Sequence, residues 1–209
     1  FQKENCEKIS LEVINILKEG KADIFALYES KPYIKSESVV FISPENISSD
    51  FDFALTIGGN GTIIKASNLV LEHEIPIIGV NLGTLGFLAG IETNELYLIS
   101  EILNGNYGID ERTTLKAEIE RPCGRKTQFN AINDIVISKN AFSGIIDIDI
   151  ECNEVETAKY RGDGVIFSPA SGSTAYAMSA GGPIVDPKAR VLLLTPINAH
   201  NLNSRSIVL

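Results

Sequence analysis

The residues closest to recognisable chemistry form a glycine-rich turn, Gly58-Gly59-Asn60-Gly61-Thr62. It lies between an apolar strand-like segment, 53–57, and a segment with apolar residues at helical spacing, 63–71. Glycines at the start of a helix let backbone N–H groups converge on an anion with no side chain in the way. The run lacks the Lys-Ser/Thr pair of a P-loop. The turn alone therefore fits either phosphate binding or a purely structural need for a tight turn.

A second glycine-rich run, GVNLGTLGFL at 79–88, directly follows another predicted buried strand. In an open α/β sheet, ligands bind beyond the carboxyl ends of the strands. Two glycine-rich loops in that position are expected to face one crevice. Two unrelated turns are the alternative.

An Asn133-Asp134 pair stands within an otherwise apolar segment, 132–137. Adjacent polar residues in a buried strand are costly unless they are paired. A carboxamide beside a carboxylate suits a ribose or a base, because together they offer donors and acceptors of fixed direction. A strand end or a bulge would also accommodate the pair.

The longest unusual segment is Arg161-Gly162-Asp163-Gly164, followed by SPASGSTAYAMSAGGP at 168–183. Small hydroxylated residues there leave backbone amides and hydroxyls open to a polar ligand. Tyr176 adds a flat face that can stack against a base. Core packing of the tyrosine and ordinary capping by the hydroxyls are the alternatives.

The predicted secondary structure around these segments changes along the chain from alternating helices and strands to strands alone. Predicted helices cover 6–18, 63–71 and 93–103, the last capped by Thr93, and predicted strands cover 22–27, 39–42, 53–57 and 75–80. Beyond residue 106 the predicted elements are short strands at 115–119, 128–137, 145–150, 155–160 and 165–168. The sequence thus predicts an α/β N-terminal domain with a mostly parallel sheet, 1–106, and a β-rich C-terminal domain, 107–209.

The two ends of the sequence and one acidic segment have unusual patterns. An α/β domain that starts on a helix, and a chain that ends inside an apolar run, suggest truncation at both ends. Asp147 and Asp149 share one face of the strand at 145–150, and solvated outer-face carboxylates are the preferred interpretation over a metal site.

Composition favours a soluble globular protein, with 44% hydrophobic residues in 209. No apolar segment approaches the roughly 20 residues needed to span a bilayer, and no signal peptide is visible. Cys6, Cys123 and Cys152 lack zinc or disulfide spacing and are expected to be reduced thiols in the cytoplasm. A net charge of −9 argues against nucleic-acid binding.

In this order and spacing, the four segments resemble the NAD kinases. The family pattern is GGDGT, then GxNxGxLGFL, then Asn-Glu or Asn-Asp, then DG followed by GSTAYxxSAGGP. The resemblance extends from about residue 53 onward and is most specific over 161–183. The sequence departs from the pattern at Asn60, which stands where the family has Asp.

The resemblance implies transfer of the γ-phosphoryl group of ATP, or in some members polyphosphate, to the 2′-hydroxyl of the adenosine ribose of NAD, giving NADP. It also implies a two-domain fold with an active crevice between the domains, magnesium accompanying ATP, and a homo-oligomer, dimer or tetramer. No residue of the sequence is assigned as a metal ligand.

The resemblance also implies a role for each residue of this sequence that matches a position of the family motifs. Asn60 occupies the place of the catalytic proton acceptor, and the phosphate loop comprises Gly58, Gly59, Gly61 and Thr62. The implied NAD-binding residues are Asn60, Gly61, Phe87, Asn133, Asp134, Arg161, Asp163, Ser171, Thr174, Ala175, Tyr176 and Ser179.

The substitution at Asn60 has a chemical consequence. A carboxylate within reach of a ribose hydroxyl accepts its proton as attack proceeds, whereas an amide does not. Because general-base assistance typically contributes about 10²–10⁴-fold, we expect the chain to bind NAD but to phosphorylate it slowly. Asn60-Gly61 is also a dipeptide prone to deamidation, which would regenerate Asp.

Two other functions compete with this interpretation. A diacylglycerol-kinase-like lipid kinase shares a GGDGT-type loop and the two-domain plan, but the GSTAY segment argues against it. An NAD- or NADP-binding sensor without turnover belongs to a different class, and Asn60 favours it.

Overall fold

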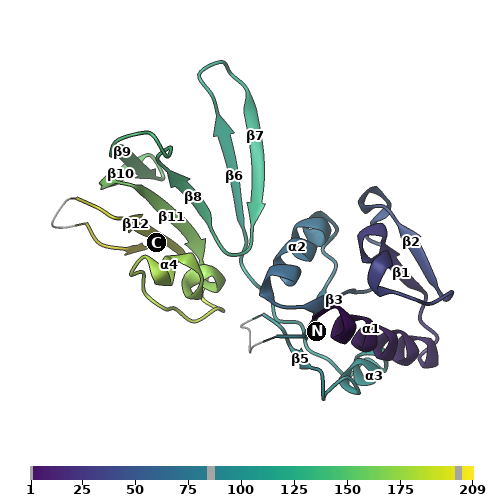
Figure 1. Cartoon of the computed structure of the whole chain (residues 1–209). Coiled ribbons are helices and arrows are strands. Elements are labelled where there is room, and N and C mark those ends of the chain that lie inside the picture. Colours follow the sequence, from purple (N-terminus) through teal and green to yellow (C-terminus); the bar gives the residue numbers. More distant parts are fainter. Residues whose placement is uncertain (1, 84–87, 201–203) are drawn as a thin grey trace. The chain divides into compact units, whose positions relative to one another are not determined.

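The computed structural model describes residues 2–83, 88–200 and 204–209 (Figure 1). The chain divides into two compact units, Phe1–Ile109 and Asp110–Leu209, which are described separately below. The described residues include no helix long and apolar enough to cross a membrane.

The first unit combines helices with parallel strands, as the sequence predicts. Its helices are α1 (Gln2–Glu19), α2 (Asn60–Val70) and α3 (Leu98–Leu103), with short 3-10 turns at Tyr28–Tyr33, Pro44–Asn46 and Leu71–His73. Its strands are β1 (Ile24–Leu27), β2 (Val39–Ile42), β3 (Ala54–Gly58), β4 (Ile77–Asn81) and β5 (Ile91–Glu92). Strand β1 pairs with β2, and β3, β4 and β5 form a second sheet; every one of these pairings is parallel.

The core of this unit lies between α1, α3 and the sheet of β3, β4 and β5. Ile9 and Val13, one helical turn apart on α1, pack with Val80 of β4 and Ile99 of α3. Each of these side chains is at most 5% exposed. Burial of an aliphatic side chain of this size contributes about 1.5–3 kcal/mol, so this cluster anchors the strands that lead into both glycine-rich segments.

The predicted helix 93–103 is wrong in its first half, because α3 begins only at Leu98. The preceding residues form turns closed by short-range bonds. Glu95 N–H donates to the Glu92 carbonyl at 2.9 Å, and Leu98 N–H donates to the Glu95 carbonyl at 2.9 Å. The N-cap is Tyr97 without a side-chain bond, so Thr93 does not cap the helix.

The second unit is built from antiparallel strands with one short helix. Its elements are β6 (Leu115–Glu120), β7 (Lys126–Ala131), β8 (Ile135–Ser138), β9 (Ile146–Cys152), β10 (Val155–Gly162), β11 (Gly164–Pro169), the 3-10 helix η4 (Ala170–Thr174), α4 (Tyr176–Ser179), β12 (Leu192–Ile197) and β13 (Ile207–Val208). Strands β13, β12, β11 and β8 form one sheet in that order, while β6 pairs with β7 and β9 with β10. The predicted β-rich character of this half is confirmed.

Strand β12 has no counterpart among the predicted elements. Leu193, Leu194 and Thr195 are all fully buried, so the strand is covered on both faces and shows no alternation of polar and apolar residues. The spacing of apolar residues does not identify such a strand, because a continuous apolar run is equally typical of a buried helix.

The predicted strand 128–137 is two strands. Strand β7 ends at Ala131 and pairs with β6, whereas β8 begins at Ile135 and pairs with β11. Residues 132–133 form a bend between them, and Asp134 directly follows it. Asn133 and Asp134 therefore lie at the junction of two sheets and not inside a strand.

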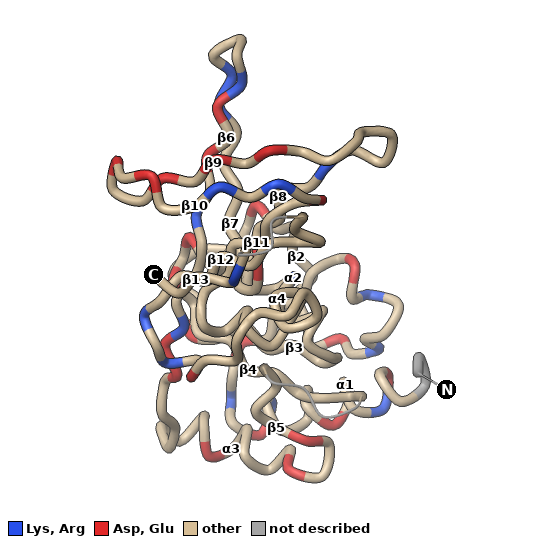
Figure 2. Tube along the Cα trace, turned by 90° about the vertical axis from the view of Figure 1, so that its left-hand side faces the viewer, with Lys and Arg blue, Asp and Glu red and all other residues tan. Residues whose placement is uncertain are grey.

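The acidic residues of β9 lie beside basic residues of the neighbouring strand β10. Figure 2 shows acidic residues in red along β9 and basic residues in blue along β10. Asp147 lies 3.8 Å from the Arg161 guanidinium, and Asp149 lies 3.8 Å from the Lys159 ammonium. Both carboxylates are exposed, in agreement with the interpretation as solvated outer-face residues.

Candidate functional site

The glycine-rich turn joins the end of β3 to the start of α2. A side chain at Gly58 would meet the Thr62 hydroxyl at 2.3 Å, so this glycine is required by packing. A side chain at Gly59 or Gly61 would meet nothing within 4 Å in the described part of the chain. The turn thus contains one packed glycine and two glycines that face open space.

Backbone donors remain unused at this turn. Thr62 N–H donates to the Gly59 carbonyl at 2.9 Å, whereas the N–H groups of Asn60 and Gly61 have no acceptor among the described residues. The first N–H groups of a helix carry a partial positive charge and stabilise a nearby anion. The start of α2 can therefore bind a phosphate through its backbone.

The half-buried Asn60 side chain contacts the second glycine-rich segment. Its Oδ1 accepts a hydrogen bond from Leu88 N–H at 3.3 Å. A carboxylate at this position could accept the same bond, because the contact needs only an oxygen. The amide therefore preserves the contact but lacks the basicity of a carboxylate.

The two glycine-rich segments lie at the same edge of the sheet, as predicted. Gly58 of β3 is the register partner of Asn81 of β4, and Leu82 N–H donates to the Gly58 carbonyl at 3.2 Å. A side chain at Gly79 would meet Ile63 Cδ1 of α2 at 2.7 Å. Phe87, a predicted site residue, lies outside the described residues.

Sequence reasoning missed a polar pair, buried Asn81 and half-buried Glu92, at the base of the second segment. Asn81 is 2% exposed, and its Nδ2 donates to Glu92 Oε1 at 3.0 Å. Its Oδ1 accepts Gly83 N–H at 3.1 Å. Asn81 thus connects the start of the loop, at Gly83, with the strand that follows it, at Glu92. The sequence feature that could have indicated this role is a single Asn at the end of an apolar strand, because a buried polar side chain needs a partner.

In the second unit, the bend at 132–133 and the adjacent Asp134 pack against η4 and the start of α4. Ser171 Oγ donates to the Ile132 carbonyl at 2.9 Å. A side chain at Gly172 would lie 1.7 Å from the Asn133 carbonyl oxygen, so only glycine fits. The Asp134 carboxylate accepts the backbone N–H of Tyr176. The structure thus brings Asn133, Asp134, Ser171 and Tyr176 together.

The environment of Asp134 perturbs its protonation. Burial raises the pKa of this carboxyl, and the hydrogen bond from Tyr176 N–H partly offsets that rise. The Tyr176 side chain is 45% exposed, so it is not part of the core and its ring is available for stacking.

The remaining predicted residues of this segment differ in exposure. Thr174 and Ala175 are half-buried before α4, and Ser179 is exposed at its end. The buried Ser173 hydroxyl instead accepts Val185 N–H at 3.3 Å and serves the packing of the following segment.

Asp163 and Arg161 make a different set of contacts. The Asp163 carboxylate lies 2.8 Å from the Lys139 ammonium and accepts a 2.9 Å bond from Asn198 Nδ2. The hydrogen bonds from Asn198 and Lys139 lower the pKa of Asp163. Arg161 is exposed beside Asp147. No sequence signal pointed to Lys139 or Asn198 as partners.

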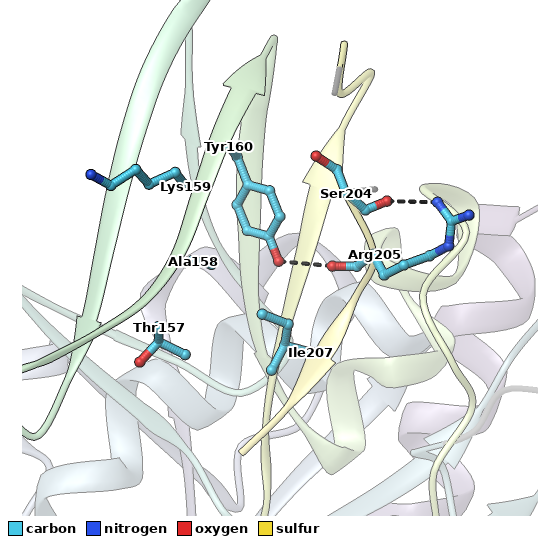
Figure 3. A pocket seen from close by; sticks show the side chains of 7 residues that line it. All are labelled: Thr157, Ala158, Lys159, Tyr160, Ser204, Arg205 and Ile207. Carbon is cyan, nitrogen blue, oxygen red and sulfur yellow. Dashed lines mark hydrogen bonds between the residues drawn. The ribbon is translucent and has the colours of Figure 1, made fainter. Parts of the chain in front are cut away.

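A cavity of about 280 Å³ lies elsewhere in the second unit, between β10 and the segment that leads into β13. Figure 3 shows the Tyr160 hydroxyl reaching across it to the Arg205 carbonyl, to which it donates at 2.8 Å. Its lining residues are Thr157, Ala158, Lys159, Tyr160, Ser204, Arg205 and Ile207. None of the predicted site residues is among them. Among the described residues, no group of three or more His, Cys, Asp or Glu side chains is placed to hold a metal ion.

Comparison with solved structures finds kinases of pyridine nucleotides. The crystal structure of yeast NADH kinase complexed with NADH matches with a TM-score of 0.86 and 25% identity, over 98% of this chain and 65% of that one. An NAD kinase from Archaeoglobus fulgidus in complex with ATP matches with a TM-score of 0.62 and 29% identity, over 82% of this chain and 67% of that one.

Comparison with sequences gives the same family. The ATP-NAD kinase N-terminal domain matches residues 11–107, and the ATP-NAD kinase C-terminal domain matches residues 132–209. An NAD kinase of Natranaerobius thermophilus is 37% identical over 100% of this chain and 73% of its own length. One of Lachnoclostridium phytofermentans is 43% identical over 84% of this chain and 64% of its own length. Both halves of the sequence carry the signature of one enzyme family, and the chain belongs to the NAD kinase family.

Proposed function

We propose that this chain transfers the γ-phosphoryl group of ATP, or of polyphosphate, to the 2′-hydroxyl of the adenosine ribose of NAD, and that Asn60 slows the reaction. The observation that carries the second part is the position of Asn60. It stands at the start of α2, between two open glycines, with its amide oxygen facing Leu88 N–H.

The turn at Gly58–Thr62 is proposed to receive the phosphates. The N–H groups of Asn60 and Gly61, which donate to no described residue, suit oxygen atoms of a phosphate. No described atom lies where a side chain at Gly59 or Gly61 would project, which would let the ligand approach the backbone. Magnesium would enter with ATP, because Mg²⁺ in such sites is held largely by substrate phosphates and water. That chemistry needs no cluster of protein ligands, and the ion's contribution is to neutralise phosphate charge.

The second-unit cluster is proposed to bind NAD. Asn133 and Asp134 offer hydrogen-bond donors and acceptors, and Tyr176 offers a half-exposed ring for a base. The fixed contacts of Ser171 and Gly172 with the bend support a rigid platform. Thr174, Ala175 and Ser179 on the same segment, and Phe87, Arg161 and Asp163 by position in the motif, complete the proposed set.

The role of Asn60 follows from proton transfer. Attack by a ribose hydroxyl requires that its proton leave as the new bond to phosphorus forms. An Asp at this position would accept the proton, whereas the Asn60 amide is not basic. The chain is therefore proposed to bind both substrates and to turn them over slowly.

The test is the identity of the product. The Asn60→Asp variant, ATP and NAD are incubated together, and NADP is detected by mass spectrometry and by an NADP-specific dehydrogenase. NADP formation, with no phosphorylation of diacylglycerol, is expected. Asn104→Asp is a matched control, because it places the same change at an exposed position after α3 and should leave the slow rate of the parent chain unchanged. A variant that phosphorylates diacylglycerol instead of NAD would contradict the proposal.

An NAD or NADP sensor is the second candidate, and Asn60 is the observation that favours it. Tight NAD binding by calorimetry, with no NADP formed by either the parent chain or Asn60→Asp, would support the sensor. A cytoplasmic location, supported by the free Cys6, Cys123 and Cys152, and a homo-oligomer remain parts of the proposal.

A further inference from the structure

We propose that Asn60 is a site of spontaneous deamidation, and that the chain converts itself in water to a form with Asp at this position. In this reaction the Gly61 backbone nitrogen attacks Asn60 Cγ, a C–N bond forms, and ammonia leaves. Water then opens the resulting cyclic imide. The net change is one amide plus water giving one carboxylic acid plus ammonia, so no oxidant or enzyme is needed.

The attacking nitrogen is available. Gly61 N–H has no acceptor among the described residues, so no hydrogen bond to any of them must be broken before it attacks. Gly61 is exposed and has no side chain, and the space where one would lie is empty in the described part of the chain. Asn60 is the first residue of α2, where helices fray most easily, so the backbone can rotate toward the cyclic geometry.

The attacked carbon is activated by its surroundings. Asn60 Oδ1 accepts Leu88 N–H at 3.3 Å. Negative charge develops on this oxygen as the nitrogen attacks. A backbone N–H aimed at a developing oxyanion stabilises it, as donors do in acyl-transfer enzymes. The contact that positions Asn60 thus also favours the loss of its amide.

The chain contains a second Asn-Gly pair, Asn104-Gly105, which acts as an internal reference. Gly105 N–H donates to the Ile102 carbonyl at 2.9 Å, so its nitrogen is engaged in a turn after α3. Gly105 is also held at a φ of +83°. Since both pairs share the same residue types, a difference in their rates reports the structure around them. We expect Asn60 to convert faster than Asn104.

The consequence for activity rests on the proposed function, whereas the deamidation itself does not. Opening of the imide gives either Asp, or isoaspartate with an extra methylene group in the backbone. Only the Asp product places a carboxylate at the general-base position without lengthening the first turn of α2. The rate of NADP formation should therefore follow the Asp fraction and not the total loss of amide.

The experiment follows freshly purified full chain during incubation at mildly alkaline pH in heavy-oxygen water. Peptide mapping by mass spectrometry gives the Asp, isoaspartate and Asn fractions at positions 60 and 104, and NADP formation is measured at each time point. We expect position 60 to convert first, and the rate to rise in proportion to its Asp fraction toward that of Asn60→Asp, a ceiling about 10²–10⁴-fold higher. In Gly61→Ala, read by mass spectrometry alone, conversion at position 60 should slow while that at position 104 is unchanged.

The outcomes separate the two proposals. Conversion at position 104 while position 60 keeps its amide would overturn the proposed deamidation. Conversion to Asp at position 60 with no rise in rate, when fresh Asn60→Asp is active, would overturn the link to activity. An inactive Asn60→Asp variant would refute the proposed kinase function and leave the deamidation result standing on its mass spectra.

Discussion

The turn at Gly58–Thr62 and the segment from Ser171 to Ser179 are both rich in small residues, yet their glycines do opposite things. At Gly61 a side chain would point into open space in the described part of the chain, and the backbone N–H is unused. At Gly172 a side chain would collide with the Asn133 carbonyl at 1.7 Å. One glycine keeps a surface open, and the other lets two segments of backbone touch.

The two segments therefore use similar compositions for different tasks. The turn in the first unit has backbone N–H groups that donate to no described residue, and such groups suit an anion. The segment in the second unit has already satisfied its own groups through Ser171, Gly172 and the N–H of Tyr176. This contrast supports the proposal that the first region handles phosphate and that the second holds a nucleoside in place.

The largest effect on stability is expected for Gly172→Ala. Its new methyl group cannot fit against backbone, so the free energy of unfolding should fall by at least about 3 kcal/mol, the upper end for overpacked sites. Gly61→Ala is the matched control, because it adds the same group to an open helical position and should stabilise by up to about 1 kcal/mol. Urea titration measures both. Equal losses in the two variants would remove the contrast between the glycines.

A smaller effect is expected for Ser171→Ala. It leaves the half-buried Ile132 carbonyl without its 2.9 Å donor, which should lower the free energy of unfolding by about 1–2 kcal/mol. Ser179→Ala, at an exposed position of the same segment, should stay within about 0.5 kcal/mol of the parent. Thermal and urea unfolding should agree on this order. A larger loss for Ser179→Ala would mean that the contact with the bend does not hold the segment.

The most subtle prediction compares two carboxyls of the second unit with opposite pKa shifts. Burial raises the pKa of Asp134, so it stabilises the fold at low pH, and that contribution is lost as pH rises from its ordinary pKa of 3.8 through its raised folded value. Hydrogen bonds lower the pKa of Asp163, so its contribution is present above its ordinary pKa of 3.8 and is lost as pH falls through its lowered folded value.

The two amide variants should therefore change the pH dependence of stability in opposite directions. In the acidic range, Asp134→Asn should make the free energy of unfolding rise more steeply with pH, and Asp163→Asn should make it rise less steeply. Urea titrations at several acidic pH values measure both slopes. Slopes that change in the same direction would contradict the assigned environments.

Local patterns predicted much of the fold. The alternation of β3, α2 and β4 follows from apolar runs punctuated by glycines, and it places Gly58 and Asn81 at one sheet edge. Patterns failed where neighbours decide the structure. Strand β12 was missed because both of its faces are covered, and the start of α3 was misplaced because Glu92 and Glu95 close turns.

The candidate site shows the same limit. Motif spacing identified Asn133, Asp134 and Tyr176, but the contact between the bend and Gly172 joins positions far apart in the sequence. The pairing of Asp163 with Lys139 and Asn198 likewise depends on how strand ends meet. Such contacts depend on tertiary packing, which no local spacing encodes.

We propose that Asn60 separates substrate binding from catalysis in this chain. The most direct measurement is steady-state kinetics of NADP formation by the parent chain and Asn60→Asp, both freshly purified and checked by mass spectrometry at position 60. We predict a kcat about 10²–10⁴-fold higher for Asn60→Asp, with the KM for NAD changed little, because the residue acts in proton transfer and not in ground-state binding. An unchanged kcat, or a change confined to KM, would contradict the claim.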